Sequence, residues 1–468
     1  MSFTGFYLLP HPPIVLPEVG KGEEQKIKKT AESMDAIGRE VAEKAPETII
    51  IVTPHGTMFQ DAIVLSNESV ITGNMKNFGA PDVSLKLPIN KELTKKIYDT
   101  AQDGGIPSIL ATAAIFKKYN ASVSIDHGTL VPLYFINRHY KNYKLVHITY
   151  APLSDIELYR FGVAISKAVE ESGENAVFIA SGDLSHRLKE EGPYGYDPSG
   201  EKFDKEFLES LQEGDVKRLF SIDKRVICDA GECGRRSAAV MLGALEGRKF
   251  KGDLLSYEGT FGVGYGIMKF DVVSEDASKL GELQTIREEA YSRKTRQTDP
   301  YVRLARESLT AYLETGREVN SIPEYVTEEM KNTNRGVFVS LKKNGELRGC
   351  IGTIFPVTNN VAEEILRNAI EAGMNDPRFY EVEADELMDI DFSVDVLTEP
   401  EPAQKDELDP AEYGVIVRSR GKTGLLLPDL EGVDTVEEQL SIALNKAGIK
   451  ADEDYSIQKF KVIRHKEE

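Results

Sequence analysis

The sequence predicts an α/β N-terminal domain, in which a central mostly parallel or mixed sheet is flanked by helices, followed by an α+β C-terminal domain. Three observations support this fold class. Short β-branched runs alternate with helical patterns in the first half of the chain, these runs end in loops that contain Pro, Gly or Ser, and the pattern changes after about residue 296. Alternating strands and helices are typical of a layered α/β domain, and the changed pattern indicates a second core.

The expected elements of the first domain follow in chain order. Apolar residues at helical spacing predict a helix within 24–46, and the run ETIIIVTPHG at 47–56 predicts a buried strand that ends in a loop. The same rhythm returns as a strand and a helix within 143–173, and as a strand in AVFIASGDLSH at 176–186. Two strand-like runs joined by a glycine-rich loop close the domain at 253–273. Functional residues of such folds gather in the loops at strand ends.

The charge-rich stretch 275–295 has no clear strand signal, and we place a linker there. The predicted domains are therefore 1–274 and 296–468. In the second domain, YVRLARESLTAYL predicts a helix, and GVFVSLKKNGELRGCIGTI predicts a strand pair with a hairpin-type Asn-Gly turn at 344–345. A long helix is expected to begin near Val361.

Composition limits the function classes. The chain has 468 residues, with 57 basic and 77 acidic side chains and a formal charge of −20, which repels phosphate backbones, so we expect no nucleic-acid partner. Its three cysteines offer neither a CxxC pair nor an even disulfide framework, which favours a reducing cytoplasm. The apolar opening FYLLPHPPIVLP lacks a basic leader and contains four prolines, so we expect neither a signal peptide nor a membrane span. These features predict a cytoplasmic protein.

Four of the seven histidines share one setting. His11, His55, His127 and His186 each lie beside Pro, Gly or Ser after an apolar stretch. A single histidine of this kind is usually a satisfied loop or core residue, but four at strand-to-loop junctions favour a metal site. Two histidines and one carboxylate bind Fe(II) and leave adjacent positions open for substrate and O₂. Glu258, which follows an apolar run in a glycine-rich loop, is the best candidate for the carboxylate, although a glutamate at a strand end is usually solvated.

Five segments of the first domain resemble the ordered motifs of the LigB-type (class III) extradiol dioxygenase superfamily, to which the Memo proteins also belong. They are LLPHPPIVLPEVG, TPHG, SIDHGTLVPL, SGDLSH and YEGTFGVGYG, and the resemblance spans roughly residues 1–273. It implies that His11, His55 and Glu258 bind iron. It also implies that His186 is the acid/base catalyst and that His127 lines the pocket for substrate and O₂.

The resemblance implies ring cleavage of a catechol-like aromatic substrate, whose hydroxyl protons a neutral histidine can accept. Asp126 and Arg235 are further candidates for substrate binding; Arg235 lies in a segment similar to a C-G-R motif of the superfamily. Cys228 and Cys233 are separated by four residues, which is not a normal zinc spacing, so we interpret them as structural. Zinc or copper at the same ligands remains an alternative to Fe(II).

The Memo branch of the superfamily supplies an alternative function. Some of its members have a cysteine in place of the acidic ligand, and the branch is associated with scaffold roles. A metal-binding scaffold without turnover is therefore the alternative to the enzyme. The carboxylate at Glu258 favours the enzyme.

Residues 296–468 resemble the AMMECR1 family through ELRGCIGTIFP, NDPRF and the long segment that begins GLLLPDLEG. The candidate site there comprises Arg348, Cys350, Asp376 and Arg378, which form either a binding pocket or a structural polar network around a tight turn. Nucleophilic catalysis by Cys350 is less favoured because it needs a basic neighbour. Memo-like and AMMECR1-like proteins are known as partners, often with a radical S-adenosylmethionine protein. We therefore expect such a partner, a small aromatic or modified-peptide substrate, and a homo-oligomer.

Overall fold

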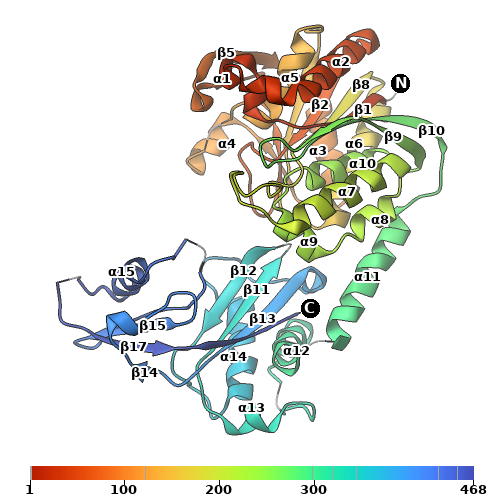
Figure 1. Cartoon of the computed structure of the whole chain (residues 1–468). Helices are drawn as coiled ribbons and strands as arrows, with labels where there is room; N and C mark the ends of the chain where they lie inside the picture. Colours follow the sequence, from red (N-terminus) through yellow and green to blue (C-terminus); the bar gives the residue numbers. More distant parts are fainter. Residues whose placement is uncertain are drawn as a thin grey trace. The chain divides into compact units, whose positions relative to one another are not determined.

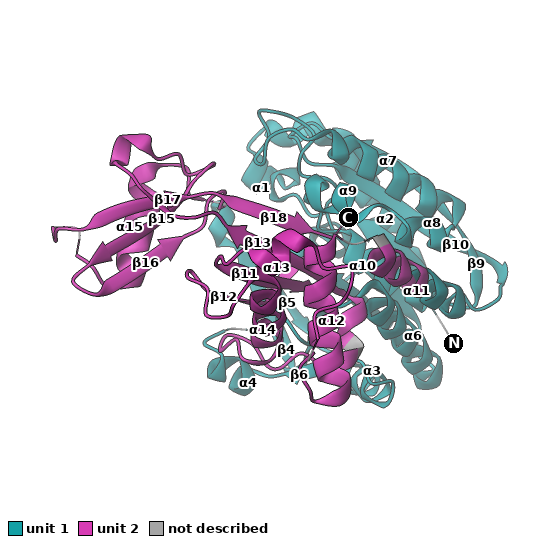
Figure 2. Cartoon of the chain, turned by 90° about the horizontal axis from the view of Figure 1, so that it is seen from below, with its two compact units in different colours: residues 1–286 teal, residues 287–468 magenta. Residues whose placement is uncertain are grey.

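The computed structural model describes residues 3–121, 123–297, 299–319, 321–343, 345–430, 432–450 and 452–467. The chain forms two compact units, residues 1–286 and 287–468, each with its own hydrophobic core (Figure 1, Figure 2). Helix α11 (Leu280–Gln297) contains the boundary between the units and most of the segment predicted as a linker. Among the described residues, no helix is both long and apolar enough to cross a membrane.

The first unit is built on an eight-stranded sheet, which confirms the predicted α/β class. In spatial order its strands are β6 (Ser108–Ala111), β3 (Ile63–Ser66), β7 (Lys144–Thr149), β2 (Thr48–Thr53), β8 (Ala176–Ser181), β1 (Phe3–Leu9), β10 (Tyr265–Glu275) and β9 (Arg248–Glu258). The four central strands β7, β2, β8 and β1 are parallel. Strands β10 and β9 form an antiparallel pair at one edge, and β3 is antiparallel to β7. The sheet is therefore mixed and mostly parallel.

Helices cover both faces of this sheet (Figure 1). One face packs against α2 (Lys28–Lys44) and α5 (His127–Asn137), and the other packs against α3 (Lys91–Asp103), α6 (Asp155–Ser172), α7 (Pro198–Glu213) and α10 (Arg235–Ala244). Successive strand residues enter opposite cores, as Phe6 and Tyr7 of β1 do. Helices α6 and α10 approach closely at Gly162, which has no side chain. A Cβ at this position would lie only 1.9 Å from the carbonyl oxygen of Val240.

Short elements complete the first unit. They are α1 (Pro17–Gly20), α4 (Ala113–Lys118), α8 (Val216–Phe220), α9 (Lys224–Ala230), the hairpin of β4 (Val70–Met75) and β5 (Ala80–Pro88), and the 3-10 helices η1 (Pro13–Val15), η2 (Glu23–Ile27) and η3 (Lys76–Phe78). The predicted strands at 47–56, 143–152 and 176–186 correspond to β2, β7 and β8, and the closing pair corresponds to β9 and β10. The sequence therefore identifies most of the central sheet.

The second unit is α+β, as predicted. Its main sheet has the order β12 (Glu346–Gly352), β11 (Val337–Lys343), β13 (Ile390–Leu397) and β18 (Val462–Lys466), with all pairs antiparallel. Helices α12 (Pro300–Thr315) and α14 (Val361–Met374) share its core, and α13 (Glu328–Asn332) and η4 (Ala384–Met388) contribute to the same core. A second sheet has the order β14 (Glu401–Pro402), β17 (Ser456–Phe460), β15 (Gly414–Ser419) and β16 (Lys422–Leu426), with α15 (Val436–Ala447) and η5 (Lys405–Glu407) nearby in the chain.

Two sequence expectations for the second unit can be compared with this arrangement. The strand pair β11–β12 has the predicted hairpin connectivity, and Gly345 has the positive φ of 90° that favours glycine, whereas Asn344 lies outside the described residues. One interpretation of the sequence places a tight turn around Cys350, and this turn is wrong, because Cys350 lies in strand β12 opposite Ser340, close to a register shift of the β11–β12 pair. Strand propensity and cross-strand pairing prevail there over the glycines on either side.

Candidate metal centre

Three of the predicted site segments leave adjacent parallel strands at the same edge of the sheet. His11 follows β1, His55 follows β2, and the loop that contains His186 follows β8, which lies between them. The carboxyl ends of parallel strands meet at one edge, so residues far apart in sequence converge there. His127 is the first residue of α5, whose cap Asp126 accepts a hydrogen bond from the Thr129 amide.

The histidine rings are in contact. The ring centroid of His11 lies 4.7 Å from that of His55 and 5.3 Å from that of His127, and the rings of His55 and His127 stack at 4.3 Å. Burial lowers the pKa of His11 and of His55, and it lowers the pKa of His127 and of His186 to about 4. The imidazoles are therefore neutral at pH 7, which is the form that binds metals.

Cys233 joins this cluster. Among the described residues, His11, His55 and Cys233 form a group whose potential ligand atoms all lie within 4.8 Å of one another. The distance from His11 Nε2 to Cys233 Sγ is 3.6 Å. Two ligands of a tetrahedral ion with metal–nitrogen and metal–sulfur bonds of about 2.0 and 2.3 Å are separated by about 3.5 Å. The spacing therefore fits a transition metal.

A hydrogen-bonded pair fixes the orientation of His11. Its Nδ1 lies 2.9 Å from Ser181 Oγ, and the Ser181 hydroxyl donates to the carbonyl oxygen of Gly128. A carbonyl can only accept, so the single proton of the hydroxyl is used there, and Ser181 must accept from the Nδ1–H of His11. The lone pair of Nε2 is then available on the side that faces Cys233.

The surroundings of the partly buried Cys233 thiol favour its protonated form over the thiolate. Burial, together with the nearby carboxyl of Asp183, raises the pKa of the thiol. The amide of Asp183 donates to Cys233 Sγ over 3.3 Å, a contact that favours negative charge on sulfur. Metal binding must therefore displace a thiol proton, which makes the affinity depend on pH.

Glu258 lies outside this group. Its Oε2 accepts hydrogen bonds from the amide and the hydroxyl of Thr30, at 2.8 and 2.7 Å. Thr30 is in the first turn of α2, whose preceding residue Ile27 provides no side-chain cap, so the Glu258 carboxylate supplies the missing acceptor at the positive end of the helix. The ligand role predicted for Glu258 stays a prediction, while the described geometry gives it a structural role.

His186 lies at the border of the metal group. Its Nε2 is 3.9 Å from Cys233 Sγ, and its ring stacks on Tyr194. Asp204 of α7 holds the loop in place. Its carboxylate accepts hydrogen bonds from the Ser185 amide at 2.7 Å and from the Tyr257 hydroxyl at 2.6 Å. Ser185 and Asp204 therefore position the loop that carries His186.

The two further substrate-binding candidates are engaged by neighbouring groups. Asp126 accepts hydrogen bonds from Thr53 and Thr129, and it lies 3.2 Å from the ring of His147. Arg235 is buried and forms an ion pair with Asp155 at 2.5 Å. Both residues position the loops around the cluster, and substrate binding by either one stays a prediction.

The candidate residues of the second unit do come together. The amide of Cys350 donates to Asp376, and Arg378 donates both to Asp376 and to the carbonyl oxygen of Cys350. Arg348 is instead paired with Glu386 at 2.9 Å. Asp376 and Arg378 thus satisfy the backbone of the edge strand β12, and a binding role for this group stays a prediction.

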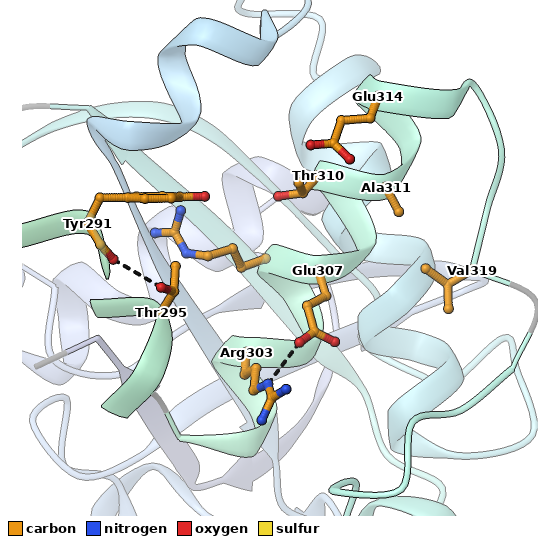
Figure 3. Close-up of a pocket in the computed structure, with 9 residues that line it drawn as sticks. Tyr291, Thr295, Arg303, Glu307, Thr310, Ala311, Glu314 and Val319 are labelled. Atoms are coloured by element: carbon orange, nitrogen blue, oxygen red, sulfur yellow. Dashed lines mark hydrogen bonds and ion pairs between the residues drawn. The ribbon is translucent and has the colours of Figure 1, made fainter. Parts of the chain in front are cut away.

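A pocket of about 390 Å³ in the second unit contains none of the predicted site residues (Figure 3). It is lined by residues of the C-terminal part of α11, among them Tyr291, and by residues of α12. Its two arginines are already paired, Arg303 with Glu307 and Arg306 with Glu467. We assign it no function.

Cys233 is a candidate metal ligand that the sequence does not predict. Its spacing from Cys228 favours a structural role, but Cys228 is exposed in α9, and the actual neighbours of Cys233 are His11 and Asp183. A cysteine in a glycine-rich segment before a predicted helix is the signal that the sequence offers for this residue.

The fold and the site define an α/β domain with neutral histidines and a thiol at the carboxyl edge of its parallel strands, joined to an α+β domain. The chain belongs to the family of the catalytic LigB subunit of aromatic ring-opening dioxygenase, which matches residues 5–268, and its residues 302–468 match AMMECR1. It is thus a fusion of these two domains.

One relative matches the whole length of the chain, and two others match about a third of it. The chain is 68% identical to Protein CA_C1420 of Clostridium acetobutylicum over 467 residues, which is 100% of both chains. It is 51% identical over 170 residues to a protein of Thermotoga maritima, covering 36% of this chain and 97% of that one. The crystal structure of the uncharacterized protein PH0010 from Pyrococcus horikoshii matches 35% of this chain and 88% of its own, with 32% identity and a TM-score of 0.33.

Proposed function

We propose that the first unit is an Fe(II)-dependent dioxygenase of the extradiol type that acts on a catechol-like or related aromatic substrate. The observation that carries this proposal is the convergence of His11, His55 and Cys233 with two further histidines, inside a LigB-family domain. Three ligands from the protein leave coordination positions open for substrate and O₂. The metal, when bound, would hold the substrate oxygens and O₂ together and lower the pKa of the hydroxyls.

His186 is the proposed proton acceptor. Its ring is neutral at pH 7, and its Nε2 is directed toward the metal group, 3.9 Å from Cys233 Sγ. A proton from a substrate hydroxyl can pass to this nitrogen and return to an oxygen later in the reaction. His127, stacked on His55, forms the opposite side of the cluster and bounds the space for the substrate.

Two other metals suit the same ligands. A thiolate and two imidazoles bind zinc and copper at least as well as Fe(II). Anaerobic purification followed by elemental analysis identifies the native metal. We expect iron, and a stoichiometric zinc content without iron would contradict the proposal.

A Memo-like metal-binding scaffold, or a component of a radical-S-adenosylmethionine-associated modification system without ring cleavage, is the second candidate. The observation that favours it is the thiol of Cys233 in the group, where an oxygenase of the 2-His-1-carboxylate type has an acidic ligand. In either case we propose that the AMMECR1 domain binds the substrate or a partner.

Oxygen uptake separates the two candidates. Iron-loaded protein is mixed anaerobically with catechol or protocatechuate, and O₂ is then admitted. If the first unit is a dioxygenase, O₂ consumption should depend on the substrate and should be lost in His55→Ala. Uptake no faster than in His55→Ala, with every catechol and with full iron content, would support the scaffold.

A further inference from the structure

Two exposed aromatic side chains lie beside the two histidines that are outside the metal group. Phe78 is 39% exposed, and its ring centroid lies 5.1 Å from that of His127. Tyr194 is 62% exposed, and its ring stacks on His186 at 5.3 Å and 18°. Both histidines are half-buried, and large exposed aromatic side chains beside such polar groups are typical of binding surfaces.

The loop that carries Tyr194 is anchored at its base. Leu188 and Tyr196 form a β-bridge, and the amide of Leu188 donates to the carbonyl oxygen of Gly262 at 3.0 Å. The Lys189 ammonium donates to the Thr260 carbonyl oxygen at 2.9 Å. These contacts tie the loop to the segment between β9 and β10, so the position of Tyr194 over His186 is set by the fold.

Phe78 is held in a similar way. It ends the 3-10 helix η3 at the tip of the β4–β5 hairpin. The amide of Ile125 donates to the Thr72 carbonyl oxygen at 2.9 Å, and a Cβ at Gly73 would lie 2.1 Å from the Ile125 carbonyl oxygen. The hairpin therefore packs directly on the segment that precedes His127, and Phe78 stays beside that histidine.

We propose that Phe78 and Tyr194 are specificity-determining residues, which recognise the faces of a planar aromatic ring at the mouth of the metal site. This inference rests on the proposed function and names the side chains that select its substrate. In the structure the ring of Tyr194 stacks on one face of His186. The planar ring of a substrate would contact the aromatic side chain at this place. A chelating ligand without a planar ring gains nothing from either side chain. Each aromatic contact is expected to change the dissociation constant about threefold to tenfold.

The affinity test uses catechol and, as a non-planar chelator, trans-1,2-cyclohexanediol, both with the anaerobic iron-loaded full chain. Tyr194→Ala and Phe78→Ala should each weaken catechol binding about threefold to tenfold, and Tyr194→Phe should retain it, because stacking needs only the ring. Tyr196→Ala is the matched control, since Tyr196 is exposed in the same loop, its bridge with Leu188 is formed by the backbone and is kept by alanine, and its ring has no contact with a site histidine among the described residues. Binding of the diol should not change in any variant.

A second measurement reports on the position of the ring directly. The chain contains no tryptophan, so Tyr194→Trp creates a protein with a single indole. Catechol should quench its emission over the same concentration range in which it binds, whereas the diol should not. Tyr196→Trp should respond at least threefold less.

Several results would overturn the inference. Catechol affinity in Tyr194→Ala and Phe78→Ala within twofold of the wild type would remove both residues from recognition and leave the proposed function intact. Loss of iron in Tyr194→Ala would show that the side chain supports the metal site instead of the substrate. If iron-loaded wild type binds no catechol, the proposed substrate class fails, and this inference fails with it.

Discussion

The Nδ1 of His11 lies 2.9 Å from the hydroxyl oxygen of Ser181, whose own proton is directed to the carbonyl oxygen of Gly128. This relationship makes Ser181 the acceptor and fixes the tautomer of His11, with Nε2 ready to bind a metal. Groups of this kind orient a ligand without touching the metal, and their loss usually lowers metal affinity tenfold to a hundredfold, as an order of magnitude.

Ser181→Ala should therefore weaken metal binding by about tenfold or more, while the fold is retained. The measurement is competition with a chromophoric chelator at fixed pH. Ser66→Ala is the matched control, because Ser66 forms a similar 2.8 Å contact with His147, which is not one of the three residues of the metal group. Equal affinities in wild type and Ser181→Ala would show that the orientation of His11 does not depend on this hydroxyl.

Glu258→Gln should keep its metal. The amide oxygen of glutamine can accept the two hydrogen bonds from Thr30, so the start of α2 should also remain intact. Elemental analysis of the purified variant, together with its thermal midpoint, checks both expectations. A metal content below half of the wild-type value would restore Glu258 to the ligand set.

His186→Gln should retain the metal and lose turnover. General acid/base groups contribute about 10² to 10⁴ in rate, so the defect should be large. The pKa of His186 is lowered to about 4, and a base is lost when it is protonated, so the wild-type rate should stay level near neutral pH and fall as the pH approaches 4. Iron content measured beside oxygen uptake separates the roles: loss of iron would make His186 a ligand.

Asp204 predicts a pH dependence of stability. Burial raises the pKa of this carboxyl to about 7 in the folded state. Its contribution to the free energy of unfolding is therefore complete below about pH 4 and is lost as the pH rises to 7. The free energy of unfolding of Asp204→Asn should therefore rise relative to that of the wild type between pH 4 and 7, by at most about 1.4 kcal/mol per pH unit. Urea unfolding at several pH values measures this difference.

Asp197→Asn is the control for that experiment. Asp197 caps the same helix, but it is less buried than Asp204, and its hydrogen bonds with Ser199 lower its pKa. Its contribution is present above the usual carboxyl pKa and is lost only in acid, so its difference from the wild type should be constant between pH 5 and 7. A flat difference for Asp204→Asn as well would contradict the raised pKa.

The second unit should respond independently of the metal. Asp376→Ala removes the acceptor for the Cys350 amide and for Arg378, which should destabilise this unit by about 1–3 kcal/mol. Cys350→Ser should leave the metal content unchanged. The exposed Asp406 supplies the control Asp406→Ala, and equal denaturant midpoints for the two alanine variants would argue against the network.

The sequence allows the four histidines to be predicted because each one lies beside Pro, Gly or Ser after an apolar stretch. It does not show strand order, and strand order decides which of these loops meet. Glu258 ends the edge strand β9, which β10 separates from β1 and therefore from His11. Local pattern alone could not distinguish it from a residue at the centre of the sheet.

Cys233 could not be predicted from the pattern of residues around it. It precedes α10 with no strand before it, so no strand-end pattern marks it. Its amide pairs with the carbonyl oxygen of Asp183 at 3.3 Å, and this long-range contact brings the thiol to the site. Such a contact depends on the packing of α10 against the sheet, which the residues around Cys233 do not encode locally.

X-ray absorption at the metal edge of anaerobically purified protein reports directly on the atoms bound to the metal. The proposed ligands predict one sulfur neighbour at about 2.3 Å together with imidazole nitrogens at about 2.0 to 2.1 Å, and loss of the sulfur neighbour in Cys233→Ser. A wild-type spectrum that contains only nitrogen and oxygen neighbours, or a sulfur neighbour that persists in Cys233→Ser, would contradict the assignment of His11, His55 and Cys233 as the metal ligands.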